Sequence, residues 1–281
     1  MQYDTIEKIG NSLIQHGPYN NRVYLMKLDS RQTINVIEQI LSLAQTNNYD
    51  RIIAKIPKPE SIAFERSGFK LEAEIPAFYS GLIPAVFMSR NLNPERDRET
   101  DINQRQKVLS AAMDCPERRP NSYGPKYRMR EISREDVDKI TALYRKVFDT
   151  YPFPIFEPRY ILKTMDENLR YFGFIDQDKI ISIASTEMSK SARNVEMTDF
   201  ATDPEYRRHG LASFLLVNME KIMIMDGFLT AYTICRATSY GINMVFAKNG
   251  YSYGGTLINN TNISGSIESM NIWYKPLINL K

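Results

Sequence analysis

The pattern of hydrophobic and polar positions in residues 127–281 changes repeatedly between the two-residue period of strands and the longer period of helices. Ser133 and Asp136 form a capping-box sequence before one of the helices. The pattern predicts strands at 127–132, 171–175, 180–187, 194–202, 229–235, 251–258 and 267–275, and helices at 133–147, 158–168, 210–226 and 237–248. The order is therefore β-α-α-β-β-β-α-β-α-β-β, which indicates an α/β fold with a mixed sheet.

The first part of the chain repeats some of this pattern. It predicts strands at 23–28, 51–56, from 69 and at 85–90, with helices at 32–45 and 60–66. Phe64–Gly68–Phe69 and Phe246–Gly250–Tyr251 each combine a helix end, a glycine suited to a left-handed C-cap and an aromatic residue that opens a strand. We interpret residues 1–90 as a shortened copy of the second half. The alternative is that the two segments share this helix–glycine–strand pattern by chance.

Residues 91–126 are predicted to connect the two domains that a length of 281 residues suggests. The mixed-charge run 93–99 is expected to be solvated. A short helix carrying Ile102, Val108, Leu109 and Met113 follows it, and Pro116 and the turn-forming segment 120–125 come next. We place the domain boundary there and assign residues 127–281 to the second domain.

Composition excludes several classes of protein. Hydrophobic residues make up 43% and charged residues 25% of the chain, as in ordinary globular proteins, and the net charge is only +3. Cys115 and Cys235 suggest no disulfide framework, and with His16 and His209 as the two histidines no metal site is expected. No run of 18 apolar residues and no secretory signal is found. We expect a soluble cytoplasmic protein that binds neither nucleic acid nor membrane.

The segment with the clearest chemistry is Arg207-x-x-Gly210-x-Ala212, between a predicted strand and a long helix. The first N–H groups of a helix have no partner within it and lie at the positive end of its dipole, so a pyrophosphate binds well there. Gly210 lets a phosphate approach the backbone, and Ala212 keeps the start of the helix narrow. The N–H groups of the loop would hold the anion, and two arginines add charge: Arg207, Arg208, His209, Gly210, Leu211 and Ala212. A capped helix with a basic first turn is the disfavoured alternative, because basic residues destabilise that end.

This loop, with a strand before it and an amphipathic helix after it, resembles the pyrophosphate loop of the GNAT acetyltransferases. Other strings, at 151–155, 196–202, 232–237, 259–265 and 268–275, are similar to those of the β-lysine N-acetyltransferase family. The resemblance implies a C-terminal GNAT domain preceded by a smaller, degenerate GNAT-like domain. It implies acetyl-CoA as co-substrate and an enzyme that makes Nε-acetyl-β-lysine, a compatible solute of osmotically stressed cells.

The resemblance also implies catalytic roles. A carboxylate on the strand before the loop often acts as base, and Glu196 stands there with Asp199 three residues on. Strand alternation would place these two on opposite faces, so we assign the base to Glu196. An ion pair or a contact with a substrate ammonium is the alternative for each. A backbone N–H freed by a bulge, from Phe200, Ala201 or Thr202, would polarise the thioester carbonyl.

The general acid is where the chain departs from the family pattern. Phe246 replaces the usual tyrosine and is expected to pack in the core. Ser239, Tyr240 or Tyr251 would protonate the thiolate, or the thiolate would leave unaided. For the substrate, we expect Arg236 to bind the carboxylate and Glu187 or Glu268 to bind the ammonium group. Tyr151 and Phe153 belong to the loop that is expected to cover the acceptor.

Three interpretations remain open from the sequence. The chain acetylates β-lysine, or it acetylates another small amine such as a polyamine, lysine or a β-lysyl antibiotic, or it is a non-catalytic regulatory module that binds CoA. The first domain has no Arg-x-x-Gly-x-Ala segment, so we expect it to bind no CoA and to pack on the second domain or complete a pseudo-dimer. A homodimer is left open.

Overall fold

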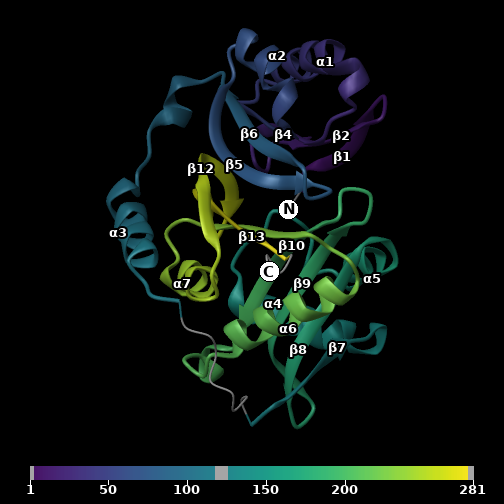
Figure 1. Ribbon diagram of the computed structural model, residues 1–281, viewed down its shortest axis with the longest axis vertical. Helices are drawn as coiled ribbons and strands as arrows, with labels where there is room; N and C mark the ends of the chain where they lie inside the picture. Colours follow the sequence, from purple (N-terminus) through teal and green to yellow (C-terminus); the bar gives the residue numbers. More distant parts are fainter. Residues whose placement is uncertain (1–2, 118–125, 278–281) are drawn as a thin grey trace.

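The computed structural model describes residues 3–117 and 126–277 (Figure 1). Short 3-10 turns lie at Ser30–Gln32, Lys58–Glu60, Pro94–Asp97, Arg134–Asp136 and Pro204–Tyr206. The elements of the first part are β1 (Thr5–Ile9), β2 (Ser12–Gly17), β3 (Arg22–Lys27), α1 (Thr33–Thr46), β4 (Arg51–Pro57), α2 (Ser61–Arg66), β5 (Lys70–Tyr79), β6 (Ile83–Asn91) and, in the connecting segment, α3 (Ile102–Met113).

The second part follows the predicted order of strands and helices. Its elements are β7 (Arg128–Ile132), α4 (Val137–Val147), α5 (Pro158–Glu167), β8 (Leu169–Asp176), β9 (Lys179–Ser189), β10 (Asn194–Thr202), α6 (Leu211–Met225), β11 (Thr230–Arg236), α7 (Tyr240–Lys248), β12 (Ser252–Ile263) and β13 (Ser266–Pro276). The capping box of Ser133 and Asp136 is confirmed, since both of its hydrogen bonds are present.

All these strands belong to one sheet of 13 strands, in the order β1-β2-β3-β4-β6-β5-β12-β13-β11-β10-β9-β8-β7. In the first half β3 and β4 are parallel, and β6 and β5 follow antiparallel. In the second half β10 and β11 are parallel, and β13 and β12 follow antiparallel. The halves thus share one pairing scheme, and the first lacks counterparts of β7, α4 and α5. From this correspondence we propose that the chain consists of a first domain (1–90), a connecting segment (91–126) and a second domain (127–281).

The two half-sheets meet edge to edge at a single residue pair, Ala73 of β5 and Gly255 of β12. A Cβ at Gly255 would lie 2.3 Å from the carbonyl oxygen of Glu72, and one at Gly254 would lie 2.7 Å from that of Glu74. Two consecutive glycines therefore allow the backbones of the half-sheets to approach each other.

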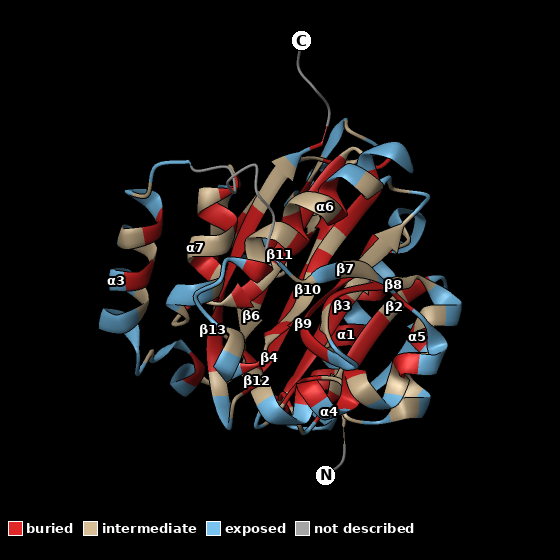
Figure 2. Ribbon diagram, turned by 90° about the horizontal axis from the view of Figure 1, so that it is seen from below, coloured by how far each residue is buried: buried red, intermediate tan, exposed pale blue. Residues whose placement is uncertain are grey.

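Figure 2 shows that buried residues are concentrated in the strands of the sheet. Three clusters of buried side chains hold this arrangement together. One lies between the first half-sheet and α1 and α2, and another between the second half-sheet and α6 and α7. The third contains side chains of both halves, such as Tyr24 and Phe87 from the first and Tyr144 and Tyr232 from the second. Because one cluster is shared, the first half packs on the second, as the sequence led us to expect.

The structure corrects the predicted elements at three places. The prediction missed β1 and β2, and β1 shows no buried side chain that could have marked it. It ended the strand now called β12 at 258, whereas β12 continues to Ile263. The run 93–99 is not wholly solvated, because Arg96 is buried and donates hydrogen bonds to the carbonyls of Asn20 and Asn259. The predicted turn at 120–125 lies outside the described residues.

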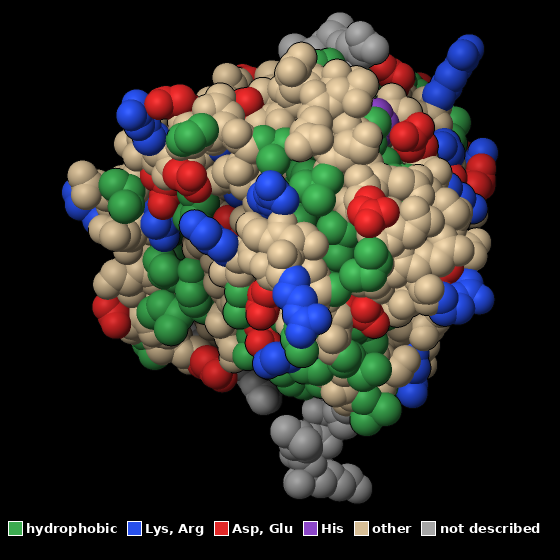
Figure 3. Space-filling view, turned by 90° about the horizontal axis from the view of Figure 1, so that it is seen from above, with side chains coloured by type: hydrophobic (Ala, Val, Ile, Leu, Met, Phe, Trp, Pro, Cys, Tyr) green, Lys and Arg blue, Asp and Glu red, His purple; other side chains and the backbone are tan. Residues whose placement is uncertain are grey.

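The connecting helix α3 packs against α7 and buries Val108 and Ala112 (Figure 1). Across the described ranges 3–117 and 126–277, no helix combines the length and the apolar character needed to cross a membrane. The same residues contain no group of three or more His, Cys, Asp or Glu side chains placed to hold a metal ion. On the face seen in Figure 3, basic and acidic side chains are interspersed.

Candidate active site

A cleft opens where two parallel strands part. β10 and β11 are paired only as far as Glu196 and Tyr232, although both strands continue beyond these residues. The strands then line a cavity of about 1180 Å³ that also reaches α6, the loop after α4 and the first half of the chain. The residues that the parted strands contribute to it are Thr198, Asp199, Phe200, Thr202, Thr233, Ile234, Cys235 and Arg236.

A bulge in β10 decides which side chains face this cavity. The pairing with β9 moves from Thr198–Ser185 to Ala201–Ile183, so β10 has one residue more than β9 over this stretch. Asp199 takes a φ of +55° at the bulge and reaches Ser185 Oγ, which donates to its carboxylate at 2.5 Å. The expectation that Asp199 and Glu196 lie on opposite faces is therefore wrong, because the extra residue interrupts the alternation. The bulge that the resemblance implied is confirmed.

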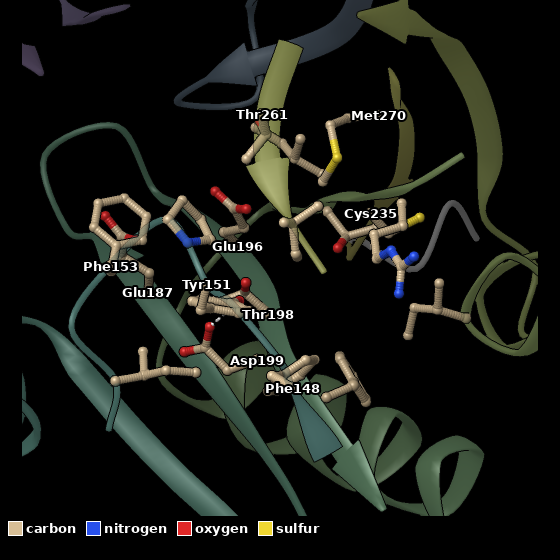
Figure 4. Close-up of a pocket in the computed structure, with 18 of the residues that line it drawn as sticks. Phe148, Tyr151, Phe153, Glu187, Glu196, Thr198, Asp199, Cys235, Thr261 and Met270 are labelled. Carbon is tan, nitrogen blue, oxygen red and sulfur yellow. Dashed lines mark hydrogen bonds between the residues drawn. The ribbon is translucent and has the colours of Figure 1, made fainter. Parts of the chain in front are cut away.

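Three carboxylates consequently face the same cavity (Figure 4). Glu187 and Glu196 lie directly opposite each other on β9 and β10, an arrangement that is unfavourable for two like charges. Burial, and after it the charge of Glu187, raises the pKa of Glu196 to about 8, against the opposing effect of Lys55. Burial also raises the pKa of Glu187 and of Asp199. A carboxylate with a pKa near 8 is suited to accept a proton near neutral pH.

The loop between α4 and α5 closes one side of the site. Tyr151 OH donates a hydrogen bond of 2.5 Å to Asp199, and Tyr151 is buried. Phe153 lines the cavity and stacks on Tyr160, with 6.4 Å between ring centroids. The structure thus places Tyr151, Phe153 and Glu187 around the cavity, as the sequence predicted.

The loop before α6 presents the predicted anion-binding segment. Arg208 and Gly210 both have left-handed backbone conformations, with φ of +67° and +72°, and α6 begins at Leu211. The N–H groups of its first turn, including that of Ser213, have no partner within the helix and lie beside the cavity. His209 does not line the cavity; its Nδ1 donates a hydrogen bond of 3.1 Å to the carbonyl oxygen of Tyr206. Ala201 is buried outside the lining, whereas its neighbours Phe200 and Thr202 belong to it.

The three candidates for the general acid differ in their position relative to the cavity. Ser239, the residue before α7, lines the cavity, whereas Tyr240 and Tyr251 do not. Tyr240 is exposed, and Tyr251 is buried against Phe246. Phe246 has no exposed surface and also contacts Phe200, so its predicted packing role is confirmed.

Two predicted substrate residues bind each other. Arg236 donates two hydrogen bonds, of 2.9 and 2.6 Å, to the carboxylate of Glu268, which also accepts one from Thr238. Arg236 lines the cavity, but Glu268 is buried outside it. We therefore remove Glu268 from the substrate contacts, because its charge is already neutralised by a bidentate partner.

The first half of the chain also lines the cavity, although none of its residues there was predicted from the sequence; the most important of them is Lys55, in β4. Lys55 Nζ donates to Tyr232 OH at 3.2 Å. Burial favours the neutral amine, but the hydroxyls of Tyr232 and Tyr24 and the two glutamates outweigh it and raise the pKa of Lys55 well above its ordinary value. The available signal was a lysine inside the apolar run of 52–56. Arg22, Tyr24 and Met26 of β3 line the cavity too.

Comparison with known proteins agrees with this geometry. The model of the acetyltransferase (GNAT) family matches residues 135–251. The chain is 38% identical over 272 residues to the beta-lysine N(6)-acetyltransferase of Methanococcus maripaludis, which covers 97% of this chain and 98% of that protein. It is 34% identical to N-acetyltransferase YodP of Bacillus subtilis, over 95% and 96% of the two chains. It is 33% identical to the beta-lysine N(6)-acetyltransferase of Methanosarcina mazei, over 84% and 94%.

Proposed function

The chain belongs to the acetyltransferase (GNAT) family, and from that premise we propose that it transfers the acetyl group of acetyl-CoA to the N6 amine of β-lysine. Two relatives of nearly the same length carry that activity in their names, and their similarity extends through the first half of the chain. The observation that supports the proposal most is the position of the carboxylate of Glu196, which lines the cavity that opens where β10 and β11 part and that reaches the loop before α6.

The loop before α6 fits the pyrophosphate of acetyl-CoA. Arg207 and Arg208 supply positive charge, and the helix start supplies N–H donors beside the cavity. At the bulge of β10, Asp199 and Phe200 have no cross-strand partner. We propose that the N–H of Phe200 or Ala201 donates to the thioester carbonyl and to the oxyanion that develops there.

Glu196 is proposed as the general base. Only about one lysine-type amine in 2500 is neutral at pH 7, given an ordinary pKa near 10.4. Glu196 takes one proton from the ammonium, the neutral amine nitrogen attacks the carbonyl carbon, and the C–S bond breaks to release the CoA thiolate, while the second proton that the nitrogen loses passes to the sulfur. Of the three candidates for the general acid, Ser239 lines the cavity, and we propose that it returns a proton to the sulfur. The acetylated product has one ammonium and one carboxylate, and we propose that it serves as a compatible solute.

Thiol release from acetyl-CoA tests the proposal, with β-lysine, α-lysine, spermidine and no acceptor supplied in parallel. We expect release with β-lysine to exceed that with each other acceptor. Equal or faster release with spermidine would exclude β-lysine as the preferred amine. If the protein binds acetyl-CoA but releases no thiol with any acceptor, the chain is better described as a regulatory module that binds CoA. The absence of a hydroxyl at Phe246 would then explain its lack of activity.

A further inference from the structure

The first half of the chain forms part of the cavity wall through one face of its sheet. Arg22, Tyr24 and Met26 alternate with Val23 and Leu25 along β3. Val23 and Leu25 pack under α1, whereas the other three line the cavity. Lys55 extends the same face on the neighbouring strand β4. Four polar or polarisable side chains are thus presented to the acceptor site by a domain without an anion-binding loop of its own.

The second half of the chain lines the cavity with charges of both signs, and its cations there are Lys163, Arg207, Arg208, Arg236 and Lys248, whereas the charges that the first half adds are both positive. The carboxylates of Glu187, Glu196 and Asp199 belong to β9 and β10, and the cations Lys55 and Arg22 belong to β4 and β3. A polyamine carries ammonium groups only, and two cations in the wall would repel it. An amine that also bears a carboxylate would match both sides of such a cavity.

Neither cation is fully engaged by protein groups. Among the described residues, Tyr232 OH is the one hydrogen-bond partner of Lys55, and no ion pair joins Lys55 to Glu187 or Glu196. Arg22 uses Nη1 for the carbonyl of Asn260 and for Thr261 Oγ1, and within the described chain no hydrogen bond occupies Nη2. Tyr24 lies beside both, with its ring 5.2 Å from Arg22 Cζ. Arg22 is buried and Lys55 is half-buried beside Glu187 and Glu196, and both cations keep N–H donors that an anion entering the cavity can use.

We propose that Lys55 and Arg22 form the carboxylate subsite of the acceptor, so that the N-terminal half selects amino acids over amines that lack a carboxylate. Lys55 donates to the carboxylate with its unused N–H groups, and Arg22 does so with Nη2. The inference deepens the proposed function and rests on it in one respect, namely that the acceptor is an amine acetylated at this cavity.

The experiment compares pairs of acceptors that differ in the carboxylate alone. These are β-lysine with 1,4-diaminopentane, and α-lysine with 1,5-diaminopentane. The preference is the ratio of kcat/KM within a pair, measured for wild type, Lys55→Met and Arg22→Gln. We expect each variant to lower the preference about 10- to 150-fold, as for the loss of a hydrogen bond to a charged group. Any effect of Lys55 on Glu196 acts on both members of a pair and cancels in the ratio.

Lys58→Met is the matched control, because Lys58 is an exposed lysine of the same half and pairs with Glu74 on the surface. It should leave the preference unchanged. Folding of each variant is checked by thermal unfolding and acetyl-CoA binding. If Lys55→Met does not fold, two other measurements replace it. One is the preference of Arg22→Gln, and the other is competition against β-lysine by 3-aminobutanoate, which is the carboxylate end of β-lysine. If 3-aminobutanoate does not compete in wild type, the subsite is overturned.

The outcomes separate the two proposals. A wild-type preference for β-lysine that both variants retain overturns the subsite and leaves the proposed function intact. A preference seen only within the α-lysine pair, and lost in the variants, refutes β-lysine as substrate and supports the subsite. A wild type without preference in either pair overturns the subsite, and the comparison of β-lysine with α-lysine and spermidine then decides the proposed function by itself.

Discussion

Replacing Glu196 by Gln separates base catalysis from binding, because the carboxamide keeps the size of the side chain and cannot take a proton. With a pKa of about 8, Glu196 is ionised to about 9% at pH 7, to about half at pH 8 and almost fully at pH 10. The wild-type rate follows the product of ionised Glu196 and protonated amine. It should therefore rise through pH 8 and level off until the amine itself titrates near pH 10.4.

The variant must rely on amine that is already neutral, so its rate should rise about tenfold per pH unit up to pH 10. From these two dependences, the ratio of wild-type to variant rate falls about 90-fold between pH 7 and pH 10. If general base catalysis contributes about 100- to 10,000-fold at pH 7, the defect at pH 10 should be between about 1- and 100-fold.

The assay is thiol release at saturating acetyl-CoA across pH 6.5 to 10, with kcat/KM for β-lysine as the measured quantity. Glu205→Gln is a suitable control, because Glu205 is an exposed carboxylate near the anion-binding loop and does not line the cavity. A defect of equal size at every pH would refute the role of Glu196 as base and would leave it a binding residue.

Three further substitutions test other parts of the site. Gly210→Ala places a side chain at a φ of +72°, where strain of about 1 kcal/mol is expected. Since a Cβ there would meet nothing closer than 3.9 Å, differential scanning fluorimetry should show only a small loss of stability. Titration should show a weaker affinity for acetyl-CoA. Phe246→Tyr restores the family's hydroxyl but buries it in the core, so we expect no gain in kcat and a loss of about 1–3 kcal/mol in unfolding by urea; a higher kcat would show that the hydroxyl reaches the thiolate. Glu268→Gln should lower stability by about 1–3 kcal/mol, because Glu268 is buried and accepts two hydrogen bonds from Arg236, and it should leave the KM for β-lysine unchanged, because Glu268 lies outside the cavity; a raised KM would restore it as an ammonium contact.

Local sequence was sufficient for the parts of the site that depend on neighbours along the chain. The strand 194–202 has the predicted bounds in β10, and the segment from Arg207 to Ala212 leads into a helix as expected. Both follow from short patterns of apolar residues, turn formers and a glycine whose left-handed conformation ends a loop.

The remaining features depend on contacts between distant residues. The bulge that turns Asp199 toward Glu196 leaves no mark on strand composition, because it is a choice of register against β9. Arg236 and Glu268 are 32 positions apart and meet only after β11 and β13 pair. Lys55 reaches Tyr232 of β11 because the two halves share one cluster of buried side chains, and no local pattern in β4 encodes that approach.

The joint between Ala73 and Gly255 also determines which strand edges of the sheet are exposed. A sheet edge with unpaired N–H and C=O groups invites association with other chains. Taken separately, the two half-sheets would have four such edges, and two of them, β5 and β12, would be exposed beside an apolar face. Joined at the glycines, they cover each other and leave β1 and β7 as the outer strands, where Glu7, Lys8, Arg128 and Arg130 are placed. Pairing of β5 with β12 thereby covers two strand edges, and a chain cut at the connecting segment would expose both.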